Sequence, residues 1–133
     1  MTAKEYLGQY RRLKTDIDSK TEQLEELREL AGSVSHSLSI GGSSGVSDKV
    51  GKTVAKIIDL ENQISRQIDK LLELKKEIED TIGKVDDPTF ILLLTLRYVN
   101  GHTFEQIALK MNYCYMQICR LHGKALEAVE KML

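Results

Sequence analysis

Residues 88–133 read PTFILLLTLRYVNGHTFEQIALKMNYCYMQICRLHGKALEAVEKML, a stretch in which helix starts and stops alternate with apolar runs. Asp87 offers a side-chain acceptor immediately before Pro88, and proline suits the first position of a helix because its missing N–H loses no partner there. Asn100-Gly101 supplies a left-handed stop. Apolar residues would occupy most of the circumference of a helix between these two points. We therefore predict a short buried helix that serves as a packing element.

Two more helices are predicted to follow. Thr103 can cap the first of them, with Gln106 completing a capping box, and Asn112 can end it. Another helix is expected over residues 115–133, where apolar residues recur at helical spacing. Two helices joined by a turn of three or four residues, with a packing helix in front, form the helix-turn-helix arrangement that reads DNA. The sequence therefore predicts a three-helix, DNA-binding module over residues 84–133.

Short motifs in this module resemble a known family. They are Leu96-Arg97-Tyr98, the run from Gly101 to Ala108, and Ile118-x-x-Leu121-His122-x-Lys124-Ala125-Leu126. This pattern resembles region 4 of sigma-70 factors. With the long helical N-terminal half and the Ser-Asp-Lys-Val-Gly stretch from Ser47, the whole chain is similar to small phage and prophage proteins described as sigma-like or late-gene transcriptional regulators. The resemblance implies a module of sigma region 4 type that binds double-stranded DNA, with RNA polymerase as a further candidate partner.

The resemblance also implies which residues read the bases. The predicted DNA-binding residues are Thr103, Tyr115, Met116, Gln117, Cys119, Arg120 and Lys124. Gln117 can pair with adenine and Arg120 with guanine through two hydrogen bonds each. Met116 or Tyr115 can contact a thymine methyl group. Sigma factors carry more arginine at these positions, where this chain has Arg120 alone.

Few cations are available for the DNA backbone. Those predicted to contact phosphates are Arg97, Lys110, Lys124 and Lys131. Residues 88–133 contain five Lys or Arg against three Glu, and the rest of the chain is acidic. Because phosphate contacts supply most of the affinity for DNA, one copy of the module is expected to bind weakly.

Residues 1–83 are expected to form two long helices, because apolar residues recur there at alternating spacings of four and three. In the first helix these residues are Tyr6, Tyr10, Leu13, Ile17, Leu24, Leu27 and Ala31. In the second they are Val50, Val54, Ile57, Ile64, Ile68, Leu71, Ile78 and Ile82. The charged exceptions are Lys20, Glu61 and Lys75. This pattern predicts a coiled-coil-like helical hairpin, with parallel self-association along one helix as the alternative.

The second helix is predicted to need more than one neighbour. Its apolar stripe is wider than a two-helix seam, because Ile58, Leu60, Leu72 and Leu74 flank the repeat. We expect the remaining face to pack against another copy or against the C-terminal module, so a homo-oligomer is expected. Residues 32–46 predict a flexible Gly/Ser linker, since small residues bury too little surface to offset the entropy of ordering. Ser47-Asp48 then predicts a helix start.

Other chemistries fit the sequence poorly. Gly51-Lys52-Thr53 matches the end of a phosphate-binding P-loop, but Val46 stands where the pattern needs glycine, and no strand is expected before it. Cys119 and His122 are one helical turn apart, yet a metal site there lacks a fourth ligand, so packing is the simpler interpretation. We therefore predict no enzyme, no catalytic residue, no metal and no cofactor.

Length and composition set the expected location. The chain of 133 residues carries a formal net charge of -1, which suits one or two small domains and not a polybasic tail. No apolar run approaches the roughly 20 residues that cross a membrane, and residues 1–6 lack the apolar core of a secretory signal. Cys114 and Cys119 suit a reducing compartment as free thiols. A cytoplasmic protein without a membrane partner is expected.

These observations predict an all-α protein in which a helical hairpin drives association and a helix-turn-helix contacts DNA. Pairing two weak modules would make the second DNA contact intramolecular and so raise the avidity. The functional hypothesis is a phage-type transcriptional regulator. Two alternatives stay open: a small-terminase-like DNA packaging component, which would form a ring of many subunits, and an interaction protein that docks on RNA polymerase and never contacts DNA.

Overall fold

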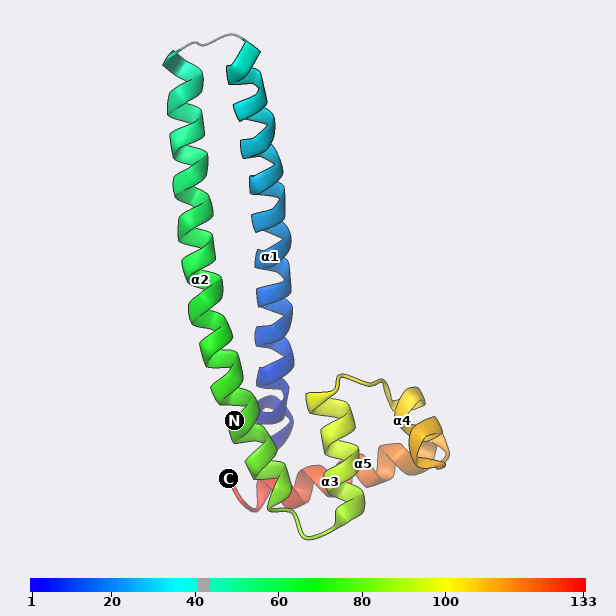
Figure 1. Cartoon of the computed structure of the whole chain (residues 1–133). Helices are drawn as coiled ribbons and strands as arrows, with labels where there is room; N and C mark the ends of the chain where they lie inside the picture. The colour runs from blue at the N-terminus through cyan, green and yellow to red at the C-terminus, as the bar shows by residue number, and fades with distance from the viewer. Residues whose placement is uncertain (41–43) are drawn as a thin grey trace. The chain divides into compact units, whose positions relative to one another are not determined.

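A computed structural model describes the backbone of residues 1–40 and 44–133, and the side chains of residues 1–33 and 49–133. The helices are α1 (Ala3–Ile40), α2 (Ser44–Gly83), α3 (Pro88–Leu94), the π-helical turn η1 (Thr95–Val99), α4 (Phe104–Met111) and α5 (Tyr115–Glu130). Figure 1 shows these helices in chain order. The described residues form no strand, which confirms the prediction of an all-α protein. None of the helices, where described, combines the length and the apolar character needed to span a membrane.

The connector between the long helices is shorter than the predicted linker over residues 32–46. Helix α1 continues to Ile40, and α2 starts at Ser44 instead of Ser47. Each Gly or Ser costs a helix only about 0.5–1 kcal/mol relative to Ala, and extending a helix that has already formed is far easier than starting one. Composition therefore overstated the length of the break. Residues 41–43 lie outside the described residues.

The chain divides into two compact units. Unit 1 consists of Met1–Lys14 and Leu71–Leu133, and unit 2 consists of Thr15–Lys70. This division differs from the predicted boundary after residue 83, because the first turns of α1 and the last turns of α2 share a core with the C-terminal helices.

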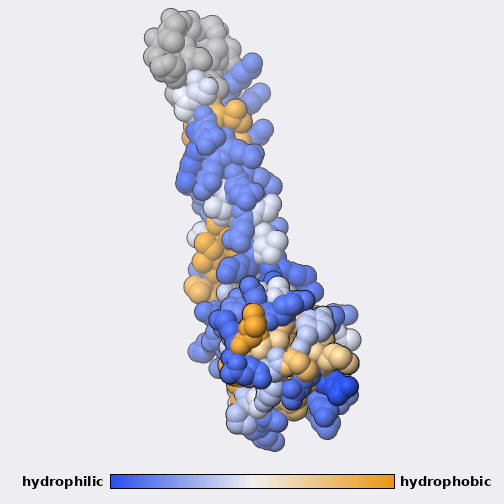
Figure 2. Space-filling view, turned by 90° about the vertical axis from the view of Figure 1, so that its right-hand side faces the viewer, coloured by the Kyte–Doolittle hydropathy of each residue, from blue (hydrophilic) through white to orange (hydrophobic). Residues whose placement is uncertain are grey.

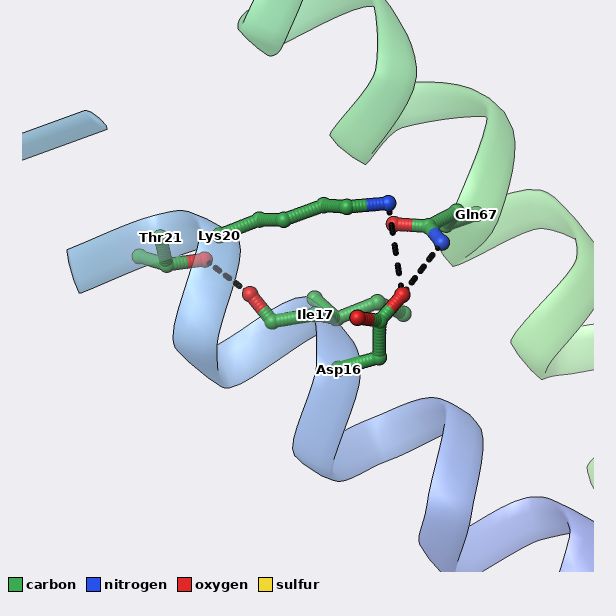
Figure 3. A network of polar contacts seen from close by, with 5 residues as sticks. All are labelled: Asp16, Ile17, Lys20, Thr21 and Gln67. Carbon is green, nitrogen blue, oxygen red and sulfur yellow. Dashed lines mark hydrogen bonds and ion pairs between the residues drawn. The ribbon is translucent and has the colours of Figure 1, made fainter. Parts of the chain in front are cut away.

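In unit 2, segments of α1 and α2 pack through the predicted apolar repeat. Ile17, Leu24 and Ile64 of that repeat are buried. A polar layer accompanies them: the Nε2 of Gln67 donates to the Oδ2 of Asp16 at 2.7 Å (Figure 3). This hydrogen bond, ahead of the nearby Lys20, holds the pKa of Asp16 below its usual value. A polar contact of this kind favours one register of two helices over neighbouring registers.

The three charged exceptions of the repeat each form an ion pair. The Nζ of Lys20 lies 3.3 Å from Asp16 Oδ2, and the Nζ of Lys75 lies 3.8 Å from Glu79 Oε1, both one turn along the same helix. Glu61 accepts instead from the other helix of unit 2, with its Oε1 at 2.9 Å from the Nη2 of Arg28. Ion pairs that are largely open to solvent contribute little to stability, so these pairs accommodate the three charges without driving the fold.

Unit 1 contains two clusters of buried residues. The first joins α1, α2, α3, η1 and α5, and its fully buried members are Ala3, Leu7, Ile78, Ile82, Leu94, Ala125 and Val129. The second joins α3, η1, α4 and α5 through Leu93, Leu96, Ile107, Ala108 and Ile118. The neighbours Leu93 and Leu94 thus enter different clusters. This explains why the first C-terminal helix is apolar around most of its circumference, as the sequence indicated.

The predicted starts and stops of the C-terminal helices are confirmed. Asp87 accepts from the backbone N–H of Thr89 at 2.9 Å and caps α3, and Thr103 forms a capping box with Gln106 at the start of α4. Asn112 ends α4 in the left-handed conformation with φ of 59°. Gly101 has φ of 75°, which glycine adopts without steric cost.

One feature of α3 differs from the prediction of a single regular helix. After Leu94 the backbone widens into η1, where the N–H of Asn100 donates to the carbonyl of Thr95, five residues earlier, at 3.0 Å. Single π-helical turns recur near functional sites in proteins. Here η1 carries Leu96 into the second buried cluster and Tyr98 into the first.

Candidate nucleic-acid interface

Helix α5 carries most of the predicted DNA-binding residues, and its inner face fixes its orientation. Ile118, Ala125 and Val129 are completely buried. Three residues, 112–114, separate α4 from α5, and the N–H of Tyr113 in this turn donates to the carbonyl of Ala108 at 3.0 Å. Burial of one face therefore leaves the opposite face of α5 pointing away from unit 1.

The predicted base-reading residues are all exposed. They are Tyr115, Met116, Gln117, Cys119 and Arg120, and Lys124 is exposed as well. At 100° per residue, Met116, Arg120 and Gly123 share the outermost face of the helix, with Gln117 and Lys124 along one edge. Met116 is 65% exposed. These side chains are available to a partner as a contiguous surface.

Gly123 lies in this surface and was not predicted. It is exposed, and a Cβ built on it would meet no atom within 4 Å. A residue without a side chain in the middle of an outward helix face allows a partner to approach the backbone closely. An isolated glycine inside a helical pattern was the signal that could have identified it, because such a glycine costs the helix about 1 kcal/mol relative to Ala.

Tyr115 and Cys119 lie one turn apart on the flank of the same helix. A side-chain hydrogen bond with Cys119, followed by the charges of Cys119 and Glu105, raises the pKa of Tyr115 above its ordinary value. The phenol therefore stays protonated at neutral pH and donates its hydrogen to Cys119, which leaves the phenol oxygen as an acceptor. Of the two exposed cysteines, Cys114 occupies the N-cap of α5 and makes no side-chain capping hydrogen bond.

The side chain of Thr103 is already used by the fold. Its Oγ1 accepts from the backbone N–H of Gln106 at 3.2 Å, and its own backbone N–H donates to Gln106 Oε1 at 2.9 Å. The hydroxyl retains its hydrogen, which is the atom that a phosphate oxygen could accept. Thr103 thus combines a capping role with one remaining donor.

Arg97 differs from the other predicted phosphate-binding residues. Lys110, Lys124 and Lys131 are exposed, whereas Arg97 is partly buried. Its guanidinium carbon lies 4.2 Å from the centre of the Phe104 ring, and its Nη1 donates to the carbonyl of His102 at 3.1 Å. These contacts hold the guanidinium in one place, which the sequence alone did not indicate.

A pair formed by the buried Tyr98 and the partly buried His122 supports the helices behind the candidate interface. The hydroxyl of Tyr98 and the Nε2 of His122 lie 2.7 Å apart, and the two rings stack with centres 5.7 Å apart. The rings of Phe104 and His122 also pack edge to face, with their centres 4.9 Å apart. Burial, followed by the charges of Arg97 and Lys4, lowers the pKa of His122 from 6.5 to about 4. His122 is therefore neutral at physiological pH and serves as a packing residue.

This low pKa predicts a pH-dependent stability. The fold favours the neutral imidazole of His122. The contribution of this residue to the free energy of unfolding is therefore complete above pH 6.5 and is lost as the pH falls toward about 4. We expect the free energy of unfolding of the wild-type protein to fall across that window more steeply than that of His122→Gln, which keeps a hydrogen-bonding partner for Tyr98 but does not titrate. Denaturant unfolding at a series of pH values measures the difference. Parallel curves for the two proteins would contradict the assignment.

Sequence reasoning also missed three cations near the C-terminal helices. Lys4, Arg11 and Arg12 of α1 line a pocket together with Arg97 and Tyr98. The first fourteen residues contain four Lys or Arg against one acid, and this local excess was the available signal. It was hidden because the chain before residue 88 is acidic as a whole.

The chain was also compared with known protein families, with curated proteins and with solved structures, and none of the three comparisons found a match. Within the described residues, no group of three or more His, Cys, Asp or Glu is placed to hold a metal ion.

Proposed function

We propose that this protein is a DNA-binding transcriptional regulator of the sigma-like phage type and that α5 is its reading helix. The observation that carries the proposal is the exposed face of α5, which includes Gln117, Arg120 and Lys124 together with Gly123. Amide and guanidinium groups are the side chains that read adenine and guanine in the major groove, and an ammonium group suits a phosphate.

The surroundings of α5 support this assignment. A short helix, a three-residue turn and a longer helix with a buried inner face form the arrangement that presents the first turns of a reading helix to DNA. Tyr115, Met116 and Gln117 occupy those first turns here. The proposed class is therefore a helix-turn-helix module like region 4 of sigma-70 factors, which follows two long helices folded as a hairpin.

Self-association through the long helices is the second part of the proposal. In unit 2, several large apolar side chains are exposed, namely Leu30, Val54, Ile58 and Ile68. Val54 and Ile58 are one helical turn apart, so they form a short apolar strip on α2. A second copy that covers this strip would bring two modules to one DNA molecule and compensate for the small number of phosphate-binding cations.

The face of the molecule drawn in Figure 2 is mixed in character. Hydrophobic patches lie among hydrophilic residues, and no single polar or apolar surface covers it. Such a surface offers a partner both apolar and polar contacts, the two kinds that side chains make with base edges.

Binding to labelled duplex fragments of the encoding genome tests this function. The chain should select a sequence, and its affinity should fall between about 50 and about 200 mM salt with the slope expected for several phosphate contacts. The mass of the complex, measured in parallel, should correspond to a small oligomer. A ring of many subunits would favour DNA packaging instead. Failure to bind at the lower salt concentration would reject DNA binding and direct the search to RNA polymerase.

A further inference from the structure

A cation-rich pocket of about 310 Å³ opens in unit 1 beside the first turns of α1 and η1. Its lining residues are Lys4, Glu5, Gly8, Arg11, Arg12, Arg97 and Tyr98. Four of them carry a positive charge and one carries a negative charge. A concave site with this imbalance attracts anions, and most strongly those with several acceptor oxygens.

The single carboxylate of the pocket is engaged elsewhere. Glu5 Oε2 accepts from the backbone N–H of Thr2 at 3.3 Å, while Thr2 Oγ1 accepts from the N–H of Glu5 at 3.2 Å, a reciprocal pair that caps the start of α1. The Nη2 of Arg12 donates to the backbone carbonyl of Glu5 at 2.9 Å and not to its carboxylate. The ion pairs found in the described part of the chain involve none of the four cations. Their charge is therefore not neutralised within the protein.

Arg97 is held in place by its neighbours, and Arg11 lies near Gly101. Arg97 is fixed by its stacking on Phe104 and its hydrogen bond to the His102 carbonyl. The exposed side chain of Arg11 lies near Gly101, where an added Cβ would be in ordinary van der Waals contact, 3.5 Å from the Nε of Arg11. A guanidinium held as that of Arg97 is loses little entropy when it binds an oxyanion, which the planar fork engages through two parallel hydrogen bonds.

The positive charge acts on the groups behind the pocket. Arg97 and Lys4 help to lower the pKa of His122, after burial. Burial raises the pKa of Tyr98, and the charges of Arg97 and Arg11 oppose that rise. The Tyr98 phenol and the His122 imidazole are therefore both neutral at neutral pH, and neither compensates the positive charge of the pocket.

Arg97 connects the pocket to the candidate interface. Its guanidinium stacks on Phe104, and the edge of the Phe104 ring contacts Tyr115 at the start of α5 with ring centres 6.4 Å apart. A DNA strand carries one phosphate per nucleotide, so bases read by the first turn of α5 are flanked by phosphates on the same strand.

We propose that the pocket formed by Lys4, Arg11, Arg12 and Arg97 binds a phosphate group, namely a phosphodiester next to the bases that α5 contacts. This assignment rests on the proposed function for its source of phosphate. The same chemistry would recognise a free phosphate-bearing molecule, and the experiment below distinguishes the two sources. The pocket would extend the interface from the C-terminal helices to the first turns of α1.

The test compares Arg11→Gln with Arg66→Gln, which removes an exposed arginine from unit 2, in the full-length chain. Thermal unfolding first establishes that both variants are folded; Lys4→Gln replaces Arg11→Gln if that variant is not. If the pocket holds a DNA phosphate, Arg11→Gln lowers the slope of log affinity against log salt by about 0.9 and leaves the preferred sequence unchanged. Arg66→Gln leaves both unchanged.

A second arm uses inorganic pyrophosphate and follows the backbone amide NMR signals of Gly8 and Gly101. If the wild-type protein binds no DNA, the proposed function fails, but pyrophosphate-dependent shifts that disappear in Arg11→Gln still support a phosphate site supplied by a free molecule. Such shifts together with an unchanged salt slope reject the DNA source alone. An unchanged slope with no shifts, or neither DNA binding nor shifts, overturns the proposal.

Discussion

Replacing Leu7 with alanine is expected to lower the free energy of unfolding by about 2–5 kcal/mol, the usual cost of removing a buried leucine side chain from a core that cannot fully close the cavity. Leu7 is completely buried, in a cluster with Ile78, Leu94 and Val129. Because this cluster joins the start of α1 to the C-terminal helices, the loss should also reach α5. Denaturant unfolding measures the free energy, and hydrogen exchange shows whether α5 loses protection.

Leu109→Ala is the matched control for Leu7→Ala. Leu109 belongs to the same unit but is 80% exposed, so its truncation should change stability by about 0.5 kcal/mol or less. If the two variants were equally stable, the first turns of α1 would not pack on the C-terminal helices, and the description of unit 1 would be wrong.

Replacing Gln117 and Arg120 together with alanine is expected to abolish selective binding to DNA. Each two-hydrogen-bond contact to a base supplies about 1–3 kcal/mol of discrimination, which corresponds to about 5- to 150-fold in affinity for each residue. Both side chains are exposed on α5, and neither belongs to a buried cluster. Helicity and subunit mass should therefore remain those of the wild-type protein. Fluorescence anisotropy with the selected sequence and with a scrambled one measures the effect.

Lys124→Ala separates base reading from phosphate binding. A residue that contacts phosphate should weaken binding to both sequences equally and lower the salt slope by about 1, whereas Arg120→Ala should change the ratio between them. If selective binding survived the double substitution, α5 would not be the reading helix.

Local chemistry explains why much of the C-terminal half was predictable. Helix caps are made by residues close together in the sequence, so the local sequence is sufficient to place a helix end. The caps here are Asp87, Thr103 with Gln106, and Asn112. The exposure of Met116 and Arg120 followed from helical spacing in the same way, once Ile118 was assigned to the inner face.

Features that depend on distant residues were not predictable. The cluster around Leu7 and Val129 joins the two ends of the chain, and no periodicity indicates which of several apolar faces will meet. Likewise, the stacking of Arg97 on Phe104 depends on the path of the backbone through η1. The cations of α1 escaped notice because their proximity to Arg97 appears only after folding.

The sequence also misjudged one local feature, the break between the long helices. The Gly/Ser content of residues 32–46 suggested a long linker, whereas α1 reaches Ile40 and α2 begins at Ser44. Propensity is a weak guide at the ends of long helices, because the formed helix lowers the cost of each additional residue.

Photo-crosslinking from α5 tests most directly whether its exposed face contacts DNA. A benzophenone side chain in place of Met116, which is 65% exposed, should crosslink to the selected duplex, and excess unlabelled duplex should compete. The same group in place of Glu25, an exposed residue of unit 2, should give no crosslink. We predict crosslinks from Met116 to the bases of the selected site. If both variants bind the duplex but crosslinks form only from position 25, or from neither position, the assignment of α5 as the reading helix is contradicted.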